Sequence, residues 1–121
     1  MQRLRCRSQF ERLLATPAAA RTPHFALHCS AGEAGTLCVG AMTPKRWARR
    51  AVTRNAIRRQ IYATGAAQHA LPAGMYLVRL RAMFAPAHFP SASSPALRRA
   101  VREELTALWQ RAAARLESVT P

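Results

Sequence analysis

The sequence has few acidic residues and almost no lysine. Its 121 residues include 5 acidic side chains against 19 basic ones, which gives a formal net charge of +14 at pH 7. A protein with that balance binds polyanions most readily. All of the basic residues except Lys45 are arginine, whose planar guanidinium contacts phosphate with two hydrogen bonds and stacks on bases. The composition therefore favours a nucleic acid partner, although a genome rich in G and C would also raise the arginine content.

The sequence also lacks the patterns of metal sites, disulfide frameworks and membrane spans. Cys6, Cys29 and Cys38 are odd in number and form no C-x-x-C pair, and the four histidines show no ligand spacing. We therefore expect no metal or cofactor bound by the protein itself. The N-terminus has no apolar run typical of a signal peptide, and no segment approaches the roughly 20 apolar residues that span a bilayer. We expect a cytoplasmic protein without a membrane partner.

A protein-borne catalytic site is not indicated either. Two of the few carboxylates, Glu103 and Glu104, lie in a segment with helical amphipathic spacing, and no acid and base pair or nucleophile motif is present. We predict no catalytic residue in this chain.

The length allows one domain with one modest core and is too short for two. No internal repeat divides the chain. We therefore expect a single domain over residues 1–121, with its core at about residues 3–117.

The N-terminal segment predicts a short helix. SQFE at residues 8–11 has the form of a capping box, with Ser8 as the N-cap and Glu11 bonding back to it. The helix must stop near Pro17, which cannot continue it.

Three segments have strand character. Residues 24–29 alternate in polarity and residues 36–43 are bulky and apolar, and the AGEAG sequence between them is typical of a turn, so we predict a β-hairpin. Residues 74–82 predict a third strand with Arg79 and Arg81 on one side. Residues 85–95 are rich in proline and serine and predict a loop.

Two further helices follow from apolar spacing. A helix that begins around residues 49–53 places Ile57 and Ile61 on its core face. Ser94 and Pro95 match an N-cap and first helical residue. Apolar residues then recur at helical spacing, namely Leu97, Val101, Leu105, Leu108, Ala112 and Leu116.

The densest positive charge lies between residues 45 and 59. Seven basic residues occur there without one acid, namely Lys45, Arg46, Arg49, Arg50, Arg54, Arg58 and Arg59. A helix face that is merely solvated usually mixes both signs of charge, because oppositely charged pairs four residues apart are favourable. Helical geometry turns Arg54, Asn55, Arg58 and Arg59 away from the isoleucines. This flank predicts contacts with nucleic acid phosphates.

The order of these segments resembles the bacterial ribonuclease P protein subunit. The signature of that family is an RNR box on its second helix, after a strand that ends in V-G-x-x-x-x-K-[KR]. The strand end is matched by Val39, Gly40, Lys45 and Arg46, and the box by Arg54, Asn55, Ile57, Arg58 and Arg59. Ala56 stands where the family usually has its second arginine. The resemblance extends over roughly residues 3–115.

The resemblance implies a compact α/β (α+β) domain with the order α-β-β-α-β-α and a sheet of three to four strands packed by helices. It also implies an accessory role in an endoribonuclease. In that family an RNA subunit, with Mg²⁺, cleaves the 5′ leader from precursor transfer RNA, and the protein assists. The implied partners are the ribonuclease P RNA subunit and the precursor tRNA 5′ leader.

The resemblance also implies two sets of binding residues. The RNA-facing set is the box and the loop before it, Lys45, Arg46, Arg50, Arg54, Asn55, Arg58 and Arg59. The single-stranded leader binds between the first helix and the sheet, where Phe10 matches an aromatic position, and Leu14 and His28 replace aromatics that relatives often carry. Arg79 and Arg81 are candidates for the same cleft. Phe10 is equally well explained as a core residue, and Trp47 as an anchor of its loop.

A structural RNA-binding protein, such as a small ribosomal protein, is the alternative function. A ribonuclease P protein and a structural RNA-binding protein both need a basic face on a small domain, so composition does not separate these two functions. The ordered motif from Val39 to Arg59 favours the ribonuclease P protein.

Overall fold

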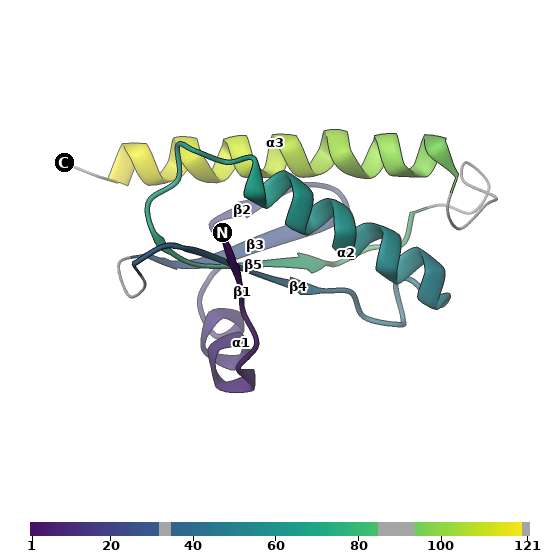
Figure 1. Ribbon diagram of the computed structural model, residues 1–121, viewed down its shortest axis with the longest axis horizontal. Helices are drawn as coiled ribbons and strands as arrows, with labels where there is room; N and C mark the ends of the chain where they lie inside the picture. Colours follow the sequence, from purple (N-terminus) through teal and green to yellow (C-terminus); the bar gives the residue numbers. More distant parts are fainter. Residues whose placement is uncertain (32–34, 85–93, 120–121) are drawn as a thin grey trace.

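The computed structural model describes residues 1–31, 35–84 and 94–119. Within these ranges the chain forms three helices and five strands (Figure 1). In chain order they are β1 (Gln2–Arg3), α1 (Arg7–Leu14), β2 (Ala20–Arg21), β3 (Phe25–Ala31), β4 (Leu37–Met42), α2 (Ala51–Ala66), β5 (Gly74–Leu80) and α3 (Pro95–Val119). The predicted order of longer elements is confirmed. The sheet has five strands rather than three or four, because β1 and β2 are too short to produce a periodic pattern.

The strand order β1-β4-β5-β3-β2 places β5 at the centre of the sheet. It pairs in parallel with β4 and antiparallel with β3. The two short strands form the edges, with β1 parallel to β4 and β2 antiparallel to β3. The central position agrees with the burial of β5, since six of its seven residues are buried.

The predicted hairpin between residues 24–29 and 36–43 is wrong, although both strands exist. In the described sheet β3 and β4 do not pair, because β5 lies between them. The chain leaves β4, passes through α2 and returns as β5, which is the usual way to join neighbouring parallel strands. A strand that is apolar on both faces is more stable in the centre of a sheet than at an edge. Most of the supposed turn, residues 32–34, lies outside the described residues.

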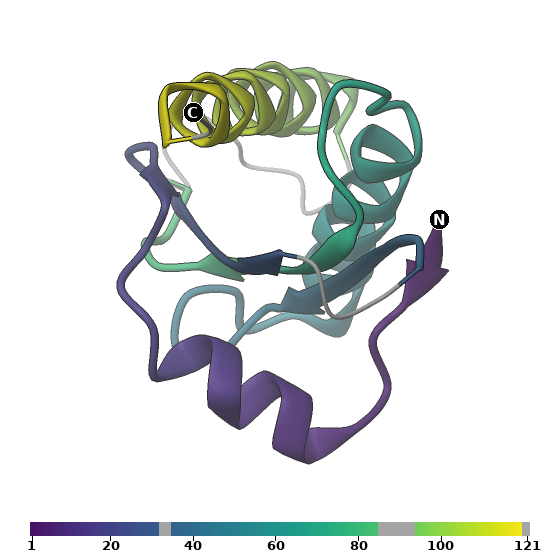
Figure 2. The same cartoon turned by 90° about the vertical axis from the view of Figure 1, so that its left-hand side faces the viewer.

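Helices cover both faces of the sheet, with α2 and α3 on one face and α1 on the other (Figure 2). The main core lies under α2 and α3, and its largest buried side chains are Trp109, Tyr76 and Phe25. A smaller core under α1 contains Leu4, Leu13, Met75 and Leu77. Because both cores share β5, the described residues form a single α+β domain.

Helix α1 does not begin with the predicted capping box. It starts at Arg7, and no side chain caps its N-terminus. Ser8 therefore lies inside the first turn, where its hydroxyl contacts Cys6 Sγ at 3.0 Å. Glu11 accepts a hydrogen bond from Arg7 Nε at 3.1 Å, an i to i+4 pair that replaces the predicted cap. The helix ends before Pro17, as predicted.

The C-terminal helix is confirmed. Ser94 Oγ accepts a hydrogen bond from the Leu97 N–H at 3.1 Å, as an N-cap does. Five of the predicted apolar residues are buried and Leu116 is partly buried. Sequence spacing missed Trp109, which is fully buried and donates from Nε1 to Thr64 Oγ1 on α2 at 3.0 Å. The predicted loop falls largely on residues 85–93, which lie outside the described residues.

Phe10 packs against the sheet at Gly40. A Cβ built at Gly40 would lie 2.9 Å from Phe10 Cε1 and 3.1 Å from Leu4 Cδ1. The glycine therefore lets α1 approach β4 closely, and the aromatic ring occupies the space of the missing side chain.

We expect Gly40→Ala to destabilise the protein by about 1–3 kcal/mol, because Phe10 and Leu4 must shift to admit the methyl group. Gly35→Ala is the control, since a Cβ there meets nothing within 4 Å. Urea unfolding of both variants measures the difference. Equal stabilities would contradict the packing of Phe10 on Gly40.

Candidate RNA-binding surface

The basic segment starts in the turn between β4 and α2. The N–H groups of Trp47 and Ala48 both donate to the Pro44 carbonyl, at 3.1 and 3.2 Å, which closes the turn. Lys45 and Arg46 are exposed on it. Trp47 packs against the main core and anchors the turn, and the Arg46 guanidinium lies 5.3 Å from the centre of its ring.

Helix α2 has the two faces that its sequence predicts. Ile57 and Ile61 are buried in the main core. Asn55, Arg58 and Arg59 are exposed on the other side. Burial of the two isoleucines therefore turns these polar side chains toward solvent.

Arg54 has a second role that the sequence did not reveal. Its Nη1 donates to the carbonyls of Ala48 and Arg49, at 3.0 and 2.7 Å. These bonds hold the chain where it enters the helix. The other donors of the guanidinium, Nε and Nη2, make no hydrogen bond with a described residue.

No acidic side chain of the described residues neutralises this surface. Glu11 pairs with Arg7, and Glu104 accepts hydrogen bonds in the turn between β2 and β3, so neither carboxylate contacts residues 45–59. The peptide dipoles of α2 give its N-terminus a partial positive charge, which no acid in the first turn and no side-chain cap compensates. Helix N-termini favour anions such as phosphate. The turn and the exposed side of α2 therefore form one continuous basic surface, hereafter the α2 basic surface.

The structure brings arginines from other elements to α2: Arg102 of α3 donates from Nε to Gln60 Oε1 at 3.1 Å, and Arg3 of β1 reaches Tyr62. Arg3 in β1 lies over the ring of Tyr62, with its Cζ 4.1 Å from the ring centre. Sequence analysis missed this contact because it depends on the pairing of β1 with β4. No local spacing relates residue 3 to residue 62.

The second candidate region is the face of the sheet that α1 covers. Phe10 is half-buried there, which fits its packing on Gly40, and Leu14 is exposed. Arg79 lies on the same face as Leu77, because alternate residues of a strand share a face. It is half-buried, and its Nε is buried without a hydrogen-bond partner among the described residues. Phe10 and Arg79 are thus brought to the same face.

His28 lies on that face as well and is 5% exposed. Its Nδ1 lies 2.9 Å from the Thr16 carbonyl, just after α1. Burial lowers the pKa of His28, and the charges of Arg79 and Arg21 lower it further, while the bond to Thr16 acts in the opposite direction. A neutral imidazole is therefore favoured, and its Nδ1–H ties the end of α1 to β3.

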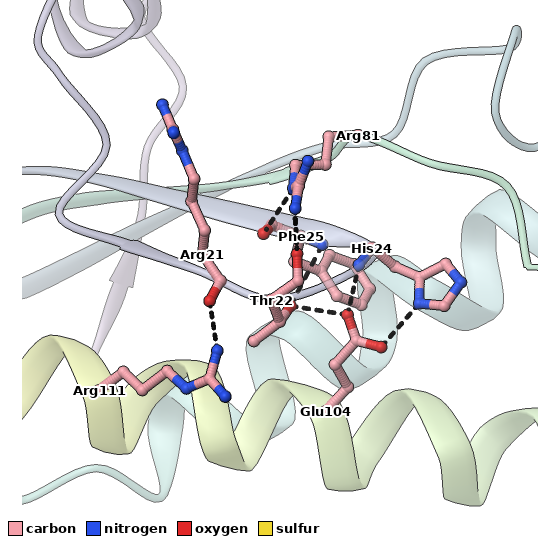
Figure 3. Close-up of polar contacts among 7 residues, drawn as sticks. All are labelled: Arg21, Thr22, His24, Phe25, Arg81, Glu104 and Arg111. Carbon is pink, nitrogen blue, oxygen red and sulfur yellow. Dashed lines mark hydrogen bonds and ion pairs between the residues drawn. The ribbon is translucent and has the colours of Figure 1, made fainter.

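Arg81 is held in the turn between β2 and β3 (Figure 3). Its Nε and Nη2 donate to the Thr22 carbonyl at 3.0 and 2.7 Å, and Nε also reaches the Phe25 carbonyl at 3.3 Å. Glu104 of α3 holds the same turn by accepting hydrogen bonds from Thr22 Oγ1 and the His24 N–H, at 2.6 and 2.7 Å. The guanidinium of Arg81 therefore stabilises the fold, unlike that of Arg79.

The comparison with protein families identifies the chain. The sequence model of the family described as Ribonuclease P matches residues 1–113. The chain belongs to the ribonuclease P protein family. Its role is accordingly that of the protein subunit of ribonuclease P in tRNA processing. Membership of this family implies an RNA partner in the assembled enzyme.

Solved structures of ribonuclease P proteins share the fold. The Staphylococcus aureus RNase P protein aligns with a TM-score of 0.69 and 18% sequence identity, over 91% of this chain and 94% of the other. A mutant of the S. aureus protein with defective mRNA degradation activity aligns with a TM-score of 0.67 and 17% identity, over 89% of this chain and 85% of the other. No curated protein sequence matches the chain closely enough to count as a relative.

The described residues hold neither a metal-binding cluster nor a helix suited to crossing a membrane. The described residues contain no group of three or more His, Cys, Asp or Glu side chains that could hold a metal ion. None of the described helices combines the length and apolar character that a membrane crossing requires.

We expect Arg54→Ala to reduce the free energy of unfolding by about 1 kcal/mol, because it removes two hydrogen bonds to the loop carbonyls. Arg58→Ala should change stability by less than about 0.5 kcal/mol, since that side chain is exposed and has no partner among the described residues. Chemical denaturation of the two variants in parallel tests this. A loss of stability for Arg58→Ala as large as that for Arg54→Ala would contradict the stabilising role of the Arg54 hydrogen bonds to the Ala48 and Arg49 carbonyls.

Proposed function

We propose that the RNA subunit of ribonuclease P carries out the cleavage and that this protein assists it. The few acidic residues support this division of labour. Glu104 is committed to the turn between β2 and β3, and Glu11 pairs with Arg7. A protein-borne hydrolytic site would require a base, an acid or a metal site, and the described residues supply no clustered set of such groups.

The α2 basic surface binds the RNA subunit. The observation that carries this assignment is the run of seven basic residues from Lys45 to Arg59 without a neutralising acid. The backbone that carries this surface is anchored, because Trp47 and Ile57 pack against the core and Arg54 bonds to the carbonyls before the helix. Arg50, Arg54, Asn55, Arg58 and Arg59 contact the RNA backbone on this surface, together with Lys45 and Arg46.

The 5′ leader of precursor tRNA binds across the face that α1 covers. Half-buried Phe10 contacts an unpaired base with the part of its ring that remains exposed, and Arg79 offers charge to the backbone. Leu14 has no ring, and the His28 ring is buried and hydrogen-bonded to the Thr16 carbonyl. Neither residue therefore supplies the base stacking of the aromatic side chains that relatives often carry at these positions. Leader binding here therefore relies more on charge than on stacking. Arg81 stabilises the turn between β2 and β3, so it affects leader binding only by fixing the position of β3.

Mg²⁺ serves the RNA rather than the protein. The catalytic RNA and its substrate are both polyanions and repel each other, and counterions relieve that repulsion. A protein of charge +14 supplies part of the neutralisation. The protein should therefore matter most when Mg²⁺ is scarce.

A cleavage assay tests this function. The ribonuclease P RNA subunit is mixed with precursor tRNA at low Mg²⁺, with and without the protein. We expect the protein to stimulate removal of the 5′ leader, and the stimulation to shrink as Mg²⁺ is raised. Cleavage that is unchanged by the protein at every Mg²⁺ concentration would overturn the proposal.

Arg58→Ala and Arg59→Ala should weaken this stimulation more than Arg111→Ala does. Arg111 is the matched control because it is exposed on α3 and donates to the Arg21 carbonyl of β2, at the opposite edge of the sheet from β1 (Figure 3). Equal losses in all three variants would indicate binding through net charge alone.

A further inference from the structure

We propose that Arg3, whose guanidinium lies over the Tyr62 ring, is an RNA-contacting residue that extends the α2 basic surface by one helical turn. This inference rests on the proposed function, since it assigns a further contact to the same surface. It concerns a residue distant in sequence from the RNR-like box and outside the motif that the family resemblance identifies.

Arg3 is held in place by its neighbours in the N-terminal strand. It pairs with Val39 of β4, and the next N–H, of Leu4, donates to the Val39 carbonyl at 2.9 Å. Leu4 is buried in the core under α1. Because side chains alternate along a strand, Arg3 faces the side on which α2 lies. At the other end Met1 Sδ lies close to α2, 3.6 Å from where a Cβ on Gly65 would be.

Tyr62 provides a fixed platform for the guanidinium. Its ring is half-buried and packs against the main core. The Arg3 Cζ lies 4.1 Å from the ring centre, which is within the range of a cation–π contact. The guanidinium carries five N–H donors, more than one ring contact engages. Arg3 is exposed and makes no hydrogen bond or ion pair with any described residue.

The position of Tyr62 makes Arg3 part of a row. Arg54, Arg58 and Tyr62 are four residues apart, so they occupy successive turns on one side of α2, about 6 Å apart along its axis. Arg3 over Tyr62 places a third guanidinium at the third position. The row then presents arginine at each of three turns, although the sequence of α2 has only two there. A regular row of guanidinium groups is suited to consecutive phosphates of an RNA strand.

The test is the affinity of the protein for the ribonuclease P RNA subunit, measured by filter binding at fixed salt. We expect Arg3→Ala to weaken binding by about fivefold. Arg3→Lys keeps the charge but loses the contact of the guanidinium with the ring and its several donors, so it should lose about half of that effect on a logarithmic scale. Tyr62→Leu should match Arg3→Lys, and Tyr62→Phe should bind like the wild type because the ring is retained. Arg111→Ala is the control for net charge.

Melting temperatures of all variants separate binding from folding. Arg3→Lys and Tyr62→Phe keep the packing, so they test the contact of the guanidinium with the ring even if Arg3→Ala or Tyr62→Leu unfolds more easily. If the wild type binds the RNA subunit and Arg3→Ala binds equally well, or if Arg111→Ala loses as much as Arg3→Ala, this inference is wrong while the proposed function stands. If the wild type does not bind the RNA subunit, both are wrong.

Discussion

Burial of Ile57 and Ile61 under the C-terminal helix and against the sheet determines which side of α2 faces solvent. Both side chains are almost completely buried in the main core. Because a helix advances 100° per residue, this burial leaves Asn55, Arg58 and Arg59 no direction except outward. The parallel pairing of β4 with β5 sets the place of the helix, since α2 is the connection between them. The orientation of the proposed RNA-binding surface thus depends on core packing.

The α2 basic surface also lowers the stability of the folded state. Basic side chains from Lys45 to Arg59 are close together without neutralising acids, and like charges on a small body repel each other. Local contacts reduce that cost without removing the charge. Arg54 bonds to carbonyls at the start of α2, and Arg46 and Arg3 lie near aromatic rings. A bound polyanion relieves the remaining repulsion, so folding and RNA binding favour each other.

The sequence predicted the elements whose signals are local. The periodicity of α2 and α3, the Ser94 cap and the three longer strands all depend on residues close in the chain. Strand pairing does not, and the hairpin between β3 and β4 was wrong because β5, which follows some thirty residues after β4, takes the place between them. The capping box at Ser8 was wrong because α1 begins at Arg7 with Cys6 as its N-cap, which places Ser8 inside the first turn.

The candidate site divides in the same way. The exposed side of α2 could be predicted from residue spacing, whereas the contact of Arg3 with Tyr62 and the hydrogen bonds of Arg81 to the turn between β2 and β3 depend on tertiary structure.

The central claim is that arginines on the exposed side of α2 neutralise RNA phosphates. The most direct measurement is the salt dependence of binding to the ribonuclease P RNA subunit. We predict that the slope of log affinity against log salt concentration is shallower by about two for the double variant Arg58→Ala/Arg59→Ala. An unchanged slope would contradict the claim.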